Sequence, residues 1–131
     1  MIRCVEIDEC ESSVLDQLRH IQRTTKADWS VEQVLEMCRS RTLMMFADEF
    51  GWVLIAWWRN RYTRKLTLEV FAAWYSGGEG LSSRYPFLLE LARQTKSDVI
   101  EVHSPRRGWE RRGFSPVDTI YRMEVPNDLD V

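Results

Sequence analysis

The feature that most constrains the fold is an apolar, strand-like segment that leads through a glycine-rich turn into a helical pattern. In residues 66–74, apolar and polar side chains first alternate, and the later residues are all apolar. Residues 75–80 include three glycines, and apolar residues then recur at helical spacing as far as Ala92. Backbone N–H groups in a glycine-rich turn can approach a phosphate closely, at the positive end of the following helix. The sequence therefore predicts an α/β chain with a phosphate site at this turn.

Length and composition fit one globular domain. The 131 residues are enough for one core and too few for two ordinary domains, and 44% of them are hydrophobic. We expect a single domain over residues 1–126, followed by an acidic tail at residues 127–131 that frays.

The charge distribution gives little support for nucleic-acid binding. The net charge is -2, although residues 51–112 carry eleven Lys and Arg against six Asp and Glu. The segment 59–65 could contact phosphates, but a basic turn of this kind is more often a solvated hairpin tip, which is the favoured interpretation.

The cysteines predict neither disulfides nor a metal site. Cys4, Cys10 and Cys38 are odd in number and form no Cys-x-x-Cys pair, so reduced thiols in a cytoplasmic protein are expected. Cys38 falls on an apolar helix face, which favours a core position over a nucleophile. Because no run approaches the roughly 18 apolar residues of a membrane span, no membrane association is expected.

The rest of the chain alternates helix and strand signals. Ser13 with Asp16, and Ser30 with Gln33, resemble capping boxes ahead of apolar residues at helical spacing. These signals predict an α/β (α+β) fold: a mixed, mostly antiparallel sheet of about six strands, with helices on both faces. The expected strands are 2–7, 42–47, 52–58, 66–74, 98–103 and 116–125, and four helices are expected to begin near Ser13, Ser30, Ser83 and Ser104.

Two short motifs carry a resemblance to a known family. Tyr75-Ser76-Gly77-Gly78-Glu79-Gly80 is similar to an acyl-CoA pyrophosphate loop of the form Gln/Arg-x-x-Gly-x-Gly/Ala, and residues 109–114 look like the signature Tyr-Glu-Lys-Leu-Gly-Phe. With this order of elements, the chain resembles the Gcn5-related N-acetyltransferase (GNAT) family over nearly its whole length. Tyr75 stands where that family has Gln or Arg, and Trp109 stands where many members have a Tyr.

The resemblance implies a GNAT-like fold and transfer of an acetyl group from acetyl-CoA to an amine. Amides of the strand before the turn would hold the carbonyl oxygen, and the turn would hold the pyrophosphate. The cofactor-binding residues implied in this way are Phe71, Ala72, Ala73, Tyr75, Gly77, Gly78, Glu79, Gly80 and Trp109.

Two side chains are candidates for proton transfer if the resemblance extends to catalysis. Glu69, on the strand entering the turn, is of the type that takes a proton from the acceptor ammonium, directly or through water. The alternative is an ordinary outward strand carboxylate. His103, at the end of a later strand, could replace the missing Tyr as the acid, because an imidazole titrates near pH 6.5.

A second hypothesis keeps the scaffold and drops the catalysis. The compact chain is also similar to GNAT-like proteins of tailed bacteriophages, some of which look like virion or assembly components. On that hypothesis the partner would be a protein, the site would be degenerate, and the location would be the host cytoplasm or the virion. Self-association into a homo-oligomer is compatible with both hypotheses.

Overall fold

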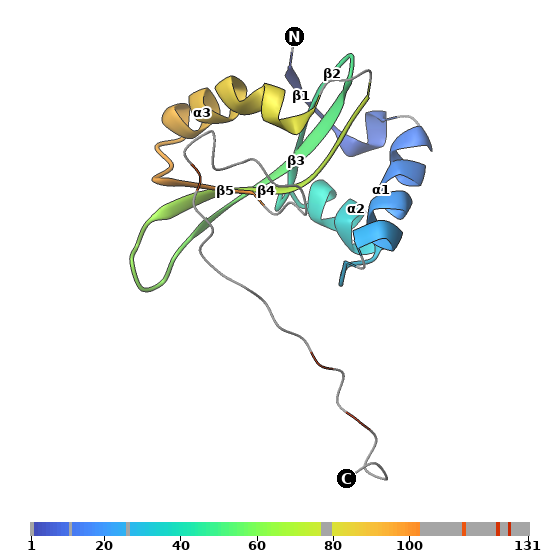
Figure 1. Ribbon diagram of the computed structural model, residues 1–131, viewed down its shortest axis with the longest axis horizontal. Coiled ribbons are helices and arrows are strands. Elements are labelled where there is room, and N and C mark those ends of the chain that lie inside the picture. Colours follow the sequence, from blue (N-terminus) through green and yellow to red (C-terminus); the bar gives the residue numbers. More distant parts are fainter. Residues whose placement is uncertain are drawn as a thin grey trace.

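A central sheet with helices on both faces forms the body of the molecule (Figure 1). The computed structural model describes residues 2–10, 12–25, 27–76 and 80–102, together with Phe114, Met123 and Pro126. The α-helices α1 and α2 lie on one side of the sheet and α3 lies on the other. The elements in chain order are β1 (Arg3–Val5), the 3-10 helix η1 (Ile7–Glu9), α1 (Ser12–Thr25), α2 (Val31–Arg39), β2 (Met44–Asp48), β3 (Gly51–Arg59), β4 (Leu66–Tyr75), the 3-10 helix η2 (Leu81–Arg84), α3 (Tyr85–Gln94) and β5 (Val99–Val102).

The sheet is mixed and mostly antiparallel, as predicted. Its strand order is β1-β2-β3-β4-β5, and each of the first three strands pairs antiparallel with the next. β5 pairs parallel with β4, which requires a crossover, and α3 supplies it. The expected sixth strand at 116–125, the expected helix at 104–113 and the expected tail at 127–131 lie outside the described residues.

One hydrophobic core lies between the sheet and the pair α1 and α2. Val14 and Leu18 of α1, four residues apart, and Val34 of α2 are buried there against Leu54 of β3. The indole N–H of Trp52 on β3 donates a 2.7 Å hydrogen bond to Gln17 of α1, which fixes the helix against the strand. Cys38 belongs to this core, so the prediction of a core cysteine is confirmed.

A second core lies on the opposite side, beneath α3. Leu88 and Ala92, one helical turn apart, are buried against Ile55 of β3 and against Leu68 and Val70 of β4. Both faces of β3 and β4 are therefore covered, which explains their nearly continuous apolar sequences.

The predicted start of α2 is confirmed and that of α1 is corrected. Ser30 accepts the backbone N–H of Gln33 at 3.1 Å, while the Gln33 side chain accepts the N–H of Ser30 at 2.8 Å, which completes a capping box. Ser13, by contrast, already lies inside α1, which includes Ser12. Asp16 does not serve that cap but pairs with Arg19 at 3.2 Å, one turn along the helix.

The helices in the described part of the chain fall short of the length and apolar character that a membrane crossing needs.

Candidate active site

A β-bulge in β4 interrupts its pairing with β3. Ile55 is opposite Val70 and Leu54 is opposite Ala72, so Phe71 is an extra residue without a partner in this ladder. Side chains alternate across a strand, and one extra residue reverses the alternation that follows. Val70 accordingly faces α3 while Phe71 and Ala72 both pack on the α1 and α2 side. The alternation that the sequence shows therefore holds as far as Phe71 and fails at Ala72.

The bulge decides where the end of β4 points. Beyond it, Ala73 and Tyr75 face α3, and Trp74 faces α1 and α2. Without the extra residue, Tyr75 would lie on the opposite face of the sheet.

β4 also extends past its parallel partner. Within the described residues the β4–β5 pairing runs from Thr67–Val99 to Val70–Val102, and β4 continues to Tyr75. On that side, the segment 71–75 has no paired strand among the described residues. Its backbone can therefore offer hydrogen-bond donors and acceptors to an extended ligand, next to the bulge.

The glycine turn is held at both of its described ends. Gly77, Gly78 and Glu79 lie outside the described residues. At the first end, the backbone N–H of Ser76 donates to the carbonyl oxygen of Phe50 at 2.9 Å. At the second, Ser83 N–H donates to the carbonyl oxygen of Gly80 at 3.1 Å, within η2.

Gly51 lets the β2–β3 turn come close to the end of β4. A Cβ atom at this position would lie 1.8 Å from the carbonyl oxygen of Trp74, which is far inside van der Waals contact. Only glycine fits there without displacing the backbone.

A buried ion pair links η2 to the same β2–β3 turn. Nη2 and Nε of Arg84 donate to Oδ2 of Asp48 at 2.7 and 3.0 Å, and both side chains are only 7% exposed. Oδ1 of Asp48 accepts the N–H groups of Phe50 at 2.8 Å and Gly51 at 3.1 Å. Burial on its own would raise the pKa of Asp48, but these hydrogen bonds and the Arg84 charge outweigh it and hold that pKa below its ordinary value.

Tyr75 completes this buried cluster. The Arg84 guanidinium carbon lies 4.3 Å from the centre of the Tyr75 ring, in cation–π contact. The Tyr75 hydroxyl is buried and makes no hydrogen bond to any described residue. Burial, with the neighbouring Asp48 charge, raises the pKa of Tyr75 to about 12 despite the opposing Arg84 charge, so the phenol stays protonated.

Helix α3 begins after the glycine turn, at Tyr85, two residues beyond the start near Ser83 that the sequence predicts. η2 occupies residues 81–84, α3 starts at Tyr85, and Pro86 lies in its first turn, where a missing N–H costs least. The free N–H groups of α3 are therefore separated from Gly80 by the whole of η2. A phosphate at this turn would depend more on the turn's own backbone than on the helix.

The remaining predicted residues divide into one that is described and two that are not. Glu69 lies on β4, half-buried, opposite Ala56 and two residues before the bulge. Ala56 packs on the α1 and α2 side, and strand pairs share a face, so Glu69 also points to that side. His103 and Trp109 lie outside the described residues, while Phe114 packs its ring edge-to-face against Tyr85 of α3.

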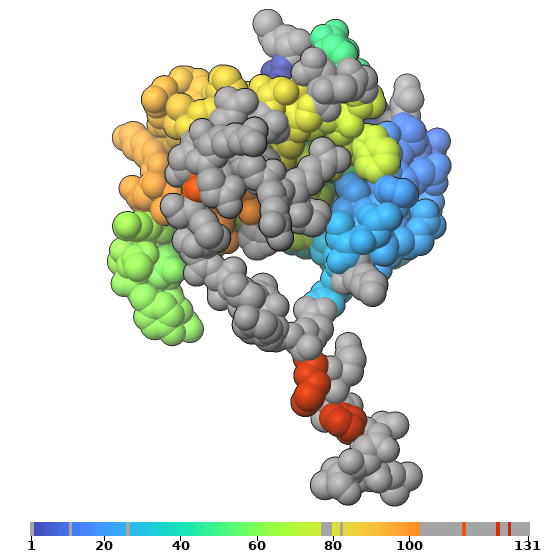
Figure 2. All heavy atoms as spheres, viewed as in Figure 1, coloured from blue at the N-terminus to red at the C-terminus, as the bar shows by residue number. Residues whose placement is uncertain are grey.

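The basic turn between β3 and β4 is a solvated tip, as the sequence favoured. Figure 2 shows this segment, in green, projecting from the body of the molecule. Its side chains from Arg61 to Lys65 are exposed, and Tyr62 is 84% exposed. Asn60 orders the turn by accepting the N–H groups of Tyr62 and Thr63 at 2.8 and 2.9 Å.

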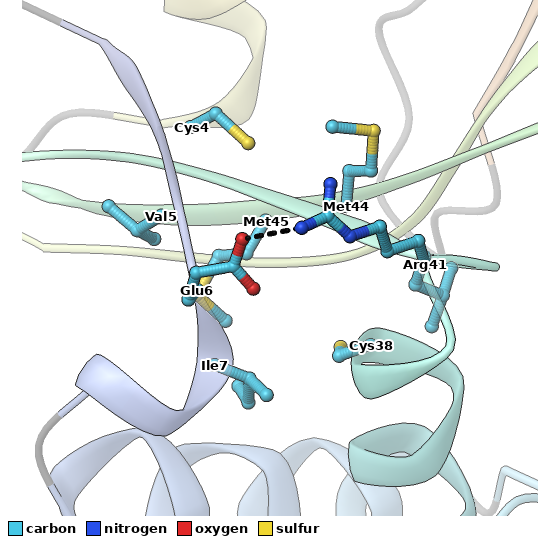
Figure 3. A pocket seen from close by; sticks show the side chains of 9 residues that line it. Cys4, Val5, Glu6, Ile7, Cys38, Arg41, Met44 and Met45 are labelled. Carbon is cyan, nitrogen blue, oxygen red and sulfur yellow. Dashed lines mark hydrogen bonds and ion pairs between the residues drawn. The ribbon is translucent and has the colours of Figure 1, made fainter.

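A small hollow lies near β1, at the opposite edge of the sheet from β5 (Figure 3). It has a volume of about 50 Å³, which is room for one or two water molecules. Arg41 pairs with Glu6 across it at 3.5 Å. Burial raises the pKa of the adjoining Cys38 thiol to about 11, so it is not a thiolate nucleophile at neutral pH. Among the described residues, no three His, Cys, Asp or Glu side chains gather where they could hold a metal ion.

Comparison with solved structures identifies the fold. The chain superposes on a ribosomal-protein-alanine N-acetyltransferase from Brucella melitensis biovar Abortus 2308 with a TM-score of 0.65 and 11% identity, over 96% of this chain and 99% of that one. It matches a predicted acetyltransferase from Clostridium acetobutylicum, solved with acetyl-CoA, with a TM-score of 0.64 and 14% identity over 95% of both chains. A putative acetyl transferase from Pyrococcus furiosus gives a TM-score of 0.62 and 14% identity, over 95% of this chain and 100% of that one.

No protein-family model and no curated protein matches the sequence. The structural matches establish the GNAT fold that the sequence motifs predicted. At such low identity they establish the fold alone, so the activity has to be argued from the residues of this chain.

Proposed function

We propose that this protein is an N-acetyltransferase that transfers the acetyl group of acetyl-CoA to an amine. The observation that carries the proposal is the end of β4, where a bulge at Phe71 precedes a segment that β5, described as far as Val102, does not pair. A backbone edge of this kind can hold the extended pantetheine arm as an added strand would be held. The GNAT fold, shared with a protein solved with acetyl-CoA, supports the same conclusion.

The residues proposed to bind acetyl-CoA follow one another along the chain. The segment Phe71, Ala72 and Ala73 would offer backbone groups to the thioester and the pantetheine arm, with an N–H near the bulge donating to the carbonyl oxygen. Tyr75, Gly77, Gly78, Glu79 and Gly80 would surround the pyrophosphate. Trp109 would complete the site from the later part of the chain.

The chemistry is direct transfer between two bound substrates. The acceptor amine, once it has lost its proton, attacks the thioester carbonyl carbon, and the oxygen of the resulting tetrahedral intermediate is stabilised by strand amides. Collapse of the intermediate breaks the carbon–sulfur bond, and the CoA thiolate takes up a proton. Glu69 is the proposed base and His103 the proposed acid.

Binding of CoA tests the first half of the proposal. Isothermal titration of the protein with CoA should give saturable binding, and Gly78→Trp should abolish it by filling the turn. Absence of binding at millimolar CoA would reject the proposal. A protein that binds CoA but releases no thiol with acetyl-CoA and a broad panel of amines would be a binding protein on this fold.

Substitution of the proposed base tests the second half. Glu69→Gln should lower kcat by roughly 10²-fold or more, the scale of general base catalysis. Glu90→Gln is the matched control, because Glu90 is a solvent-exposed carboxylate on α3, on the opposite face of the sheet. Equal activity of the two variants would remove Glu69 from the mechanism.

A further inference from the structure

We propose that Arg84 is a positioning residue of the acyl-CoA site, whose buried guanidinium holds the described residues on either side of the glycine turn in place and thereby favours binding of the pyrophosphate between them. The inference rests on the proposed function. It assigns to Arg84 an effect exerted through the turn and not through direct contact with the ligand.

The cation is placed where it cannot serve as a surface ligand. Arg84 is only 6% exposed, and its Nε and Nη2 both donate to Oδ2 of Asp48. Burying a guanidinium is costly unless hydrogen bonds and an opposite charge compensate it. Asp48 provides both, and its negative charge also offsets the field that Arg84 would otherwise exert on a phosphate. We therefore expect Arg84 to act by holding neighbouring residues in place and not by contacting the phosphate.

The guanidinium contacts the structure on both sides of the turn. Tyr75, the last residue of β4 before the turn, lies against its face at 4.3 Å. Arg84 itself closes η2, four residues after Gly80. Phe50, whose ring is 5.5 Å from the same guanidinium, accepts the N–H of Ser76 at the start of the turn. One side chain thus joins the entry and the exit of the turn.

The β2–β3 turn serves as the rigid support for this arrangement. Oδ1 of Asp48 accepts the backbone N–H groups of Phe50 and Gly51, so the carboxylate is oriented before it meets Arg84. The close approach of Gly51 to the carbonyl of Trp74 fixes the same turn against β4. Fixing the ends of a loop reduces the entropy that it loses when a ligand orders it.

The position of Arg84 also accounts for Tyr75 at the place where the motif that this turn resembles has Gln or Arg. A flat aromatic ring presents a face to the guanidinium, and the bulge at Phe71 turns that ring toward α3, where Arg84 lies. The two residues form one unit although they are nine positions apart.

The test compares two acetyl donors that share the thioester and differ in the pyrophosphate. Acetyl-CoA carries it, and S-acetylpantetheine ends before it. We expect Arg84→Met to raise the Kd for CoA and the KM for acetyl-CoA about tenfold, while kcat/KM for S-acetylpantetheine stays within about twofold of the wild type. A residue that only supports the fold would change both donors alike.

Matched control variants distinguish a positioning effect on CoA binding from a general loss of stability. Arg39→Met removes an arginine from an exposed pair with Asp8, at 3.2 Å, and should leave both donors unaffected. Asp48→Asn is nearly isosteric and weakens the same pair, so it takes the place of Arg84→Met as the test variant if Arg84→Met fails to fold. Arg84→Lys keeps the charge without the planar fork and should recover only part of the CoA affinity. All measurements are made well below the unfolding midpoint of each variant.

The outcomes distinguish this inference from the function on which it rests. If the wild type binds no CoA, the proposed function is rejected and the inference with it. If the wild type binds CoA and Arg84→Met binds it equally well, the inference alone is rejected. An equal loss with both donors also rejects it, because the effect is then not specific to the pyrophosphate end.

Discussion

Breaking the Asp48–Arg84 pair should destabilise the fold far more than breaking an exposed pair. Each side chain is 7% exposed, and Arg84→Met leaves a buried carboxylate without its countercharge. Removing one partner of a buried pair costs about 3–5 kcal/mol, whereas exposed pairs contribute about 0–1 kcal/mol. The two hydrogen bonds that Asp48 keeps from Phe50 and Gly51 favour the lower half of that range. For a chain of this size, 3–4 kcal/mol corresponds to a fall of roughly 10–15 °C in Tm.

Urea unfolding followed by circular dichroism measures this difference. Arg84→Met should lose about 3–4 kcal/mol, and Arg39→Met, at the exposed pair with Asp8, no more than about 1 kcal/mol. The double variant Asp48→Leu/Arg84→Met should lose less than the sum of the single variants, because neither partner of this pair is then left buried without the other. If Arg84→Met and Arg39→Met lie within about 1 kcal/mol of each other, the buried pair does not have the energetic role argued from its burial.

Three further outcomes follow from the same region. Because the folded-state pKa of Asp48 lies below its ordinary value of 3.8, its stabilising contribution is present above that pH and is lost as the pH falls through the folded-state pKa. The stability difference between wild type and Asp48→Asn should therefore shrink on acidification below pH 4, and a constant difference from pH 7 to pH 2 would contradict the assignment. Gly51→Ala should cost about 3 kcal/mol in urea unfolding, since the new methyl group meets the Trp74 carbonyl oxygen; a cost below about 1 kcal/mol would show that this approach is not close. Tyr75→Phe should be neutral or stabilising by up to about 1 kcal/mol, because it keeps the ring under Arg84 and removes a buried hydroxyl that has no partner among the described residues; a clear loss of thermal stability would mean that the hydroxyl is hydrogen-bonded.

Local sequence signals were sufficient for much of the fold. The capping box at Ser30 and the apolar spacing of α2 depend on neighbours within one or two helical turns, and both were predicted. The β2–β3 hairpin is equally local, and the start of α3 lies two residues from the one predicted near Ser83. These elements follow from short-range physical chemistry that a sequence displays directly.

The site depends on long-range features that no local pattern encodes. The bulge at Phe71 lies within a continuous apolar run, where a reversal of the two faces leaves no polar signature. Asp48 and Arg84 are 36 residues apart and meet only because β3 and β4 bring the β2–β3 turn beside η2. The sequence assigned neither residue to the site. Glu69 was chosen because it is a carboxylate on the strand that enters the glycine turn, and its role as a base stays a prediction.

The two hydrophobic cores have a consequence for how this protein can change over evolutionary time. They share the sheet backbone but use different side chains, with Leu54 and Ala72 on one side and Ile55 and Val70 on the other. Substitutions on opposite sides that are far apart and share no contact should therefore combine nearly additively in their effects on stability. Under the proposed function, substitutions that alter recognition of the amine would fall on the α1 and α2 side, toward which Glu69 points, and those that alter binding of the acyl donor on the α3 side, with Tyr75 and Arg84. The specificity for the acceptor amine and the affinity for the acyl donor would then evolve independently within one small domain.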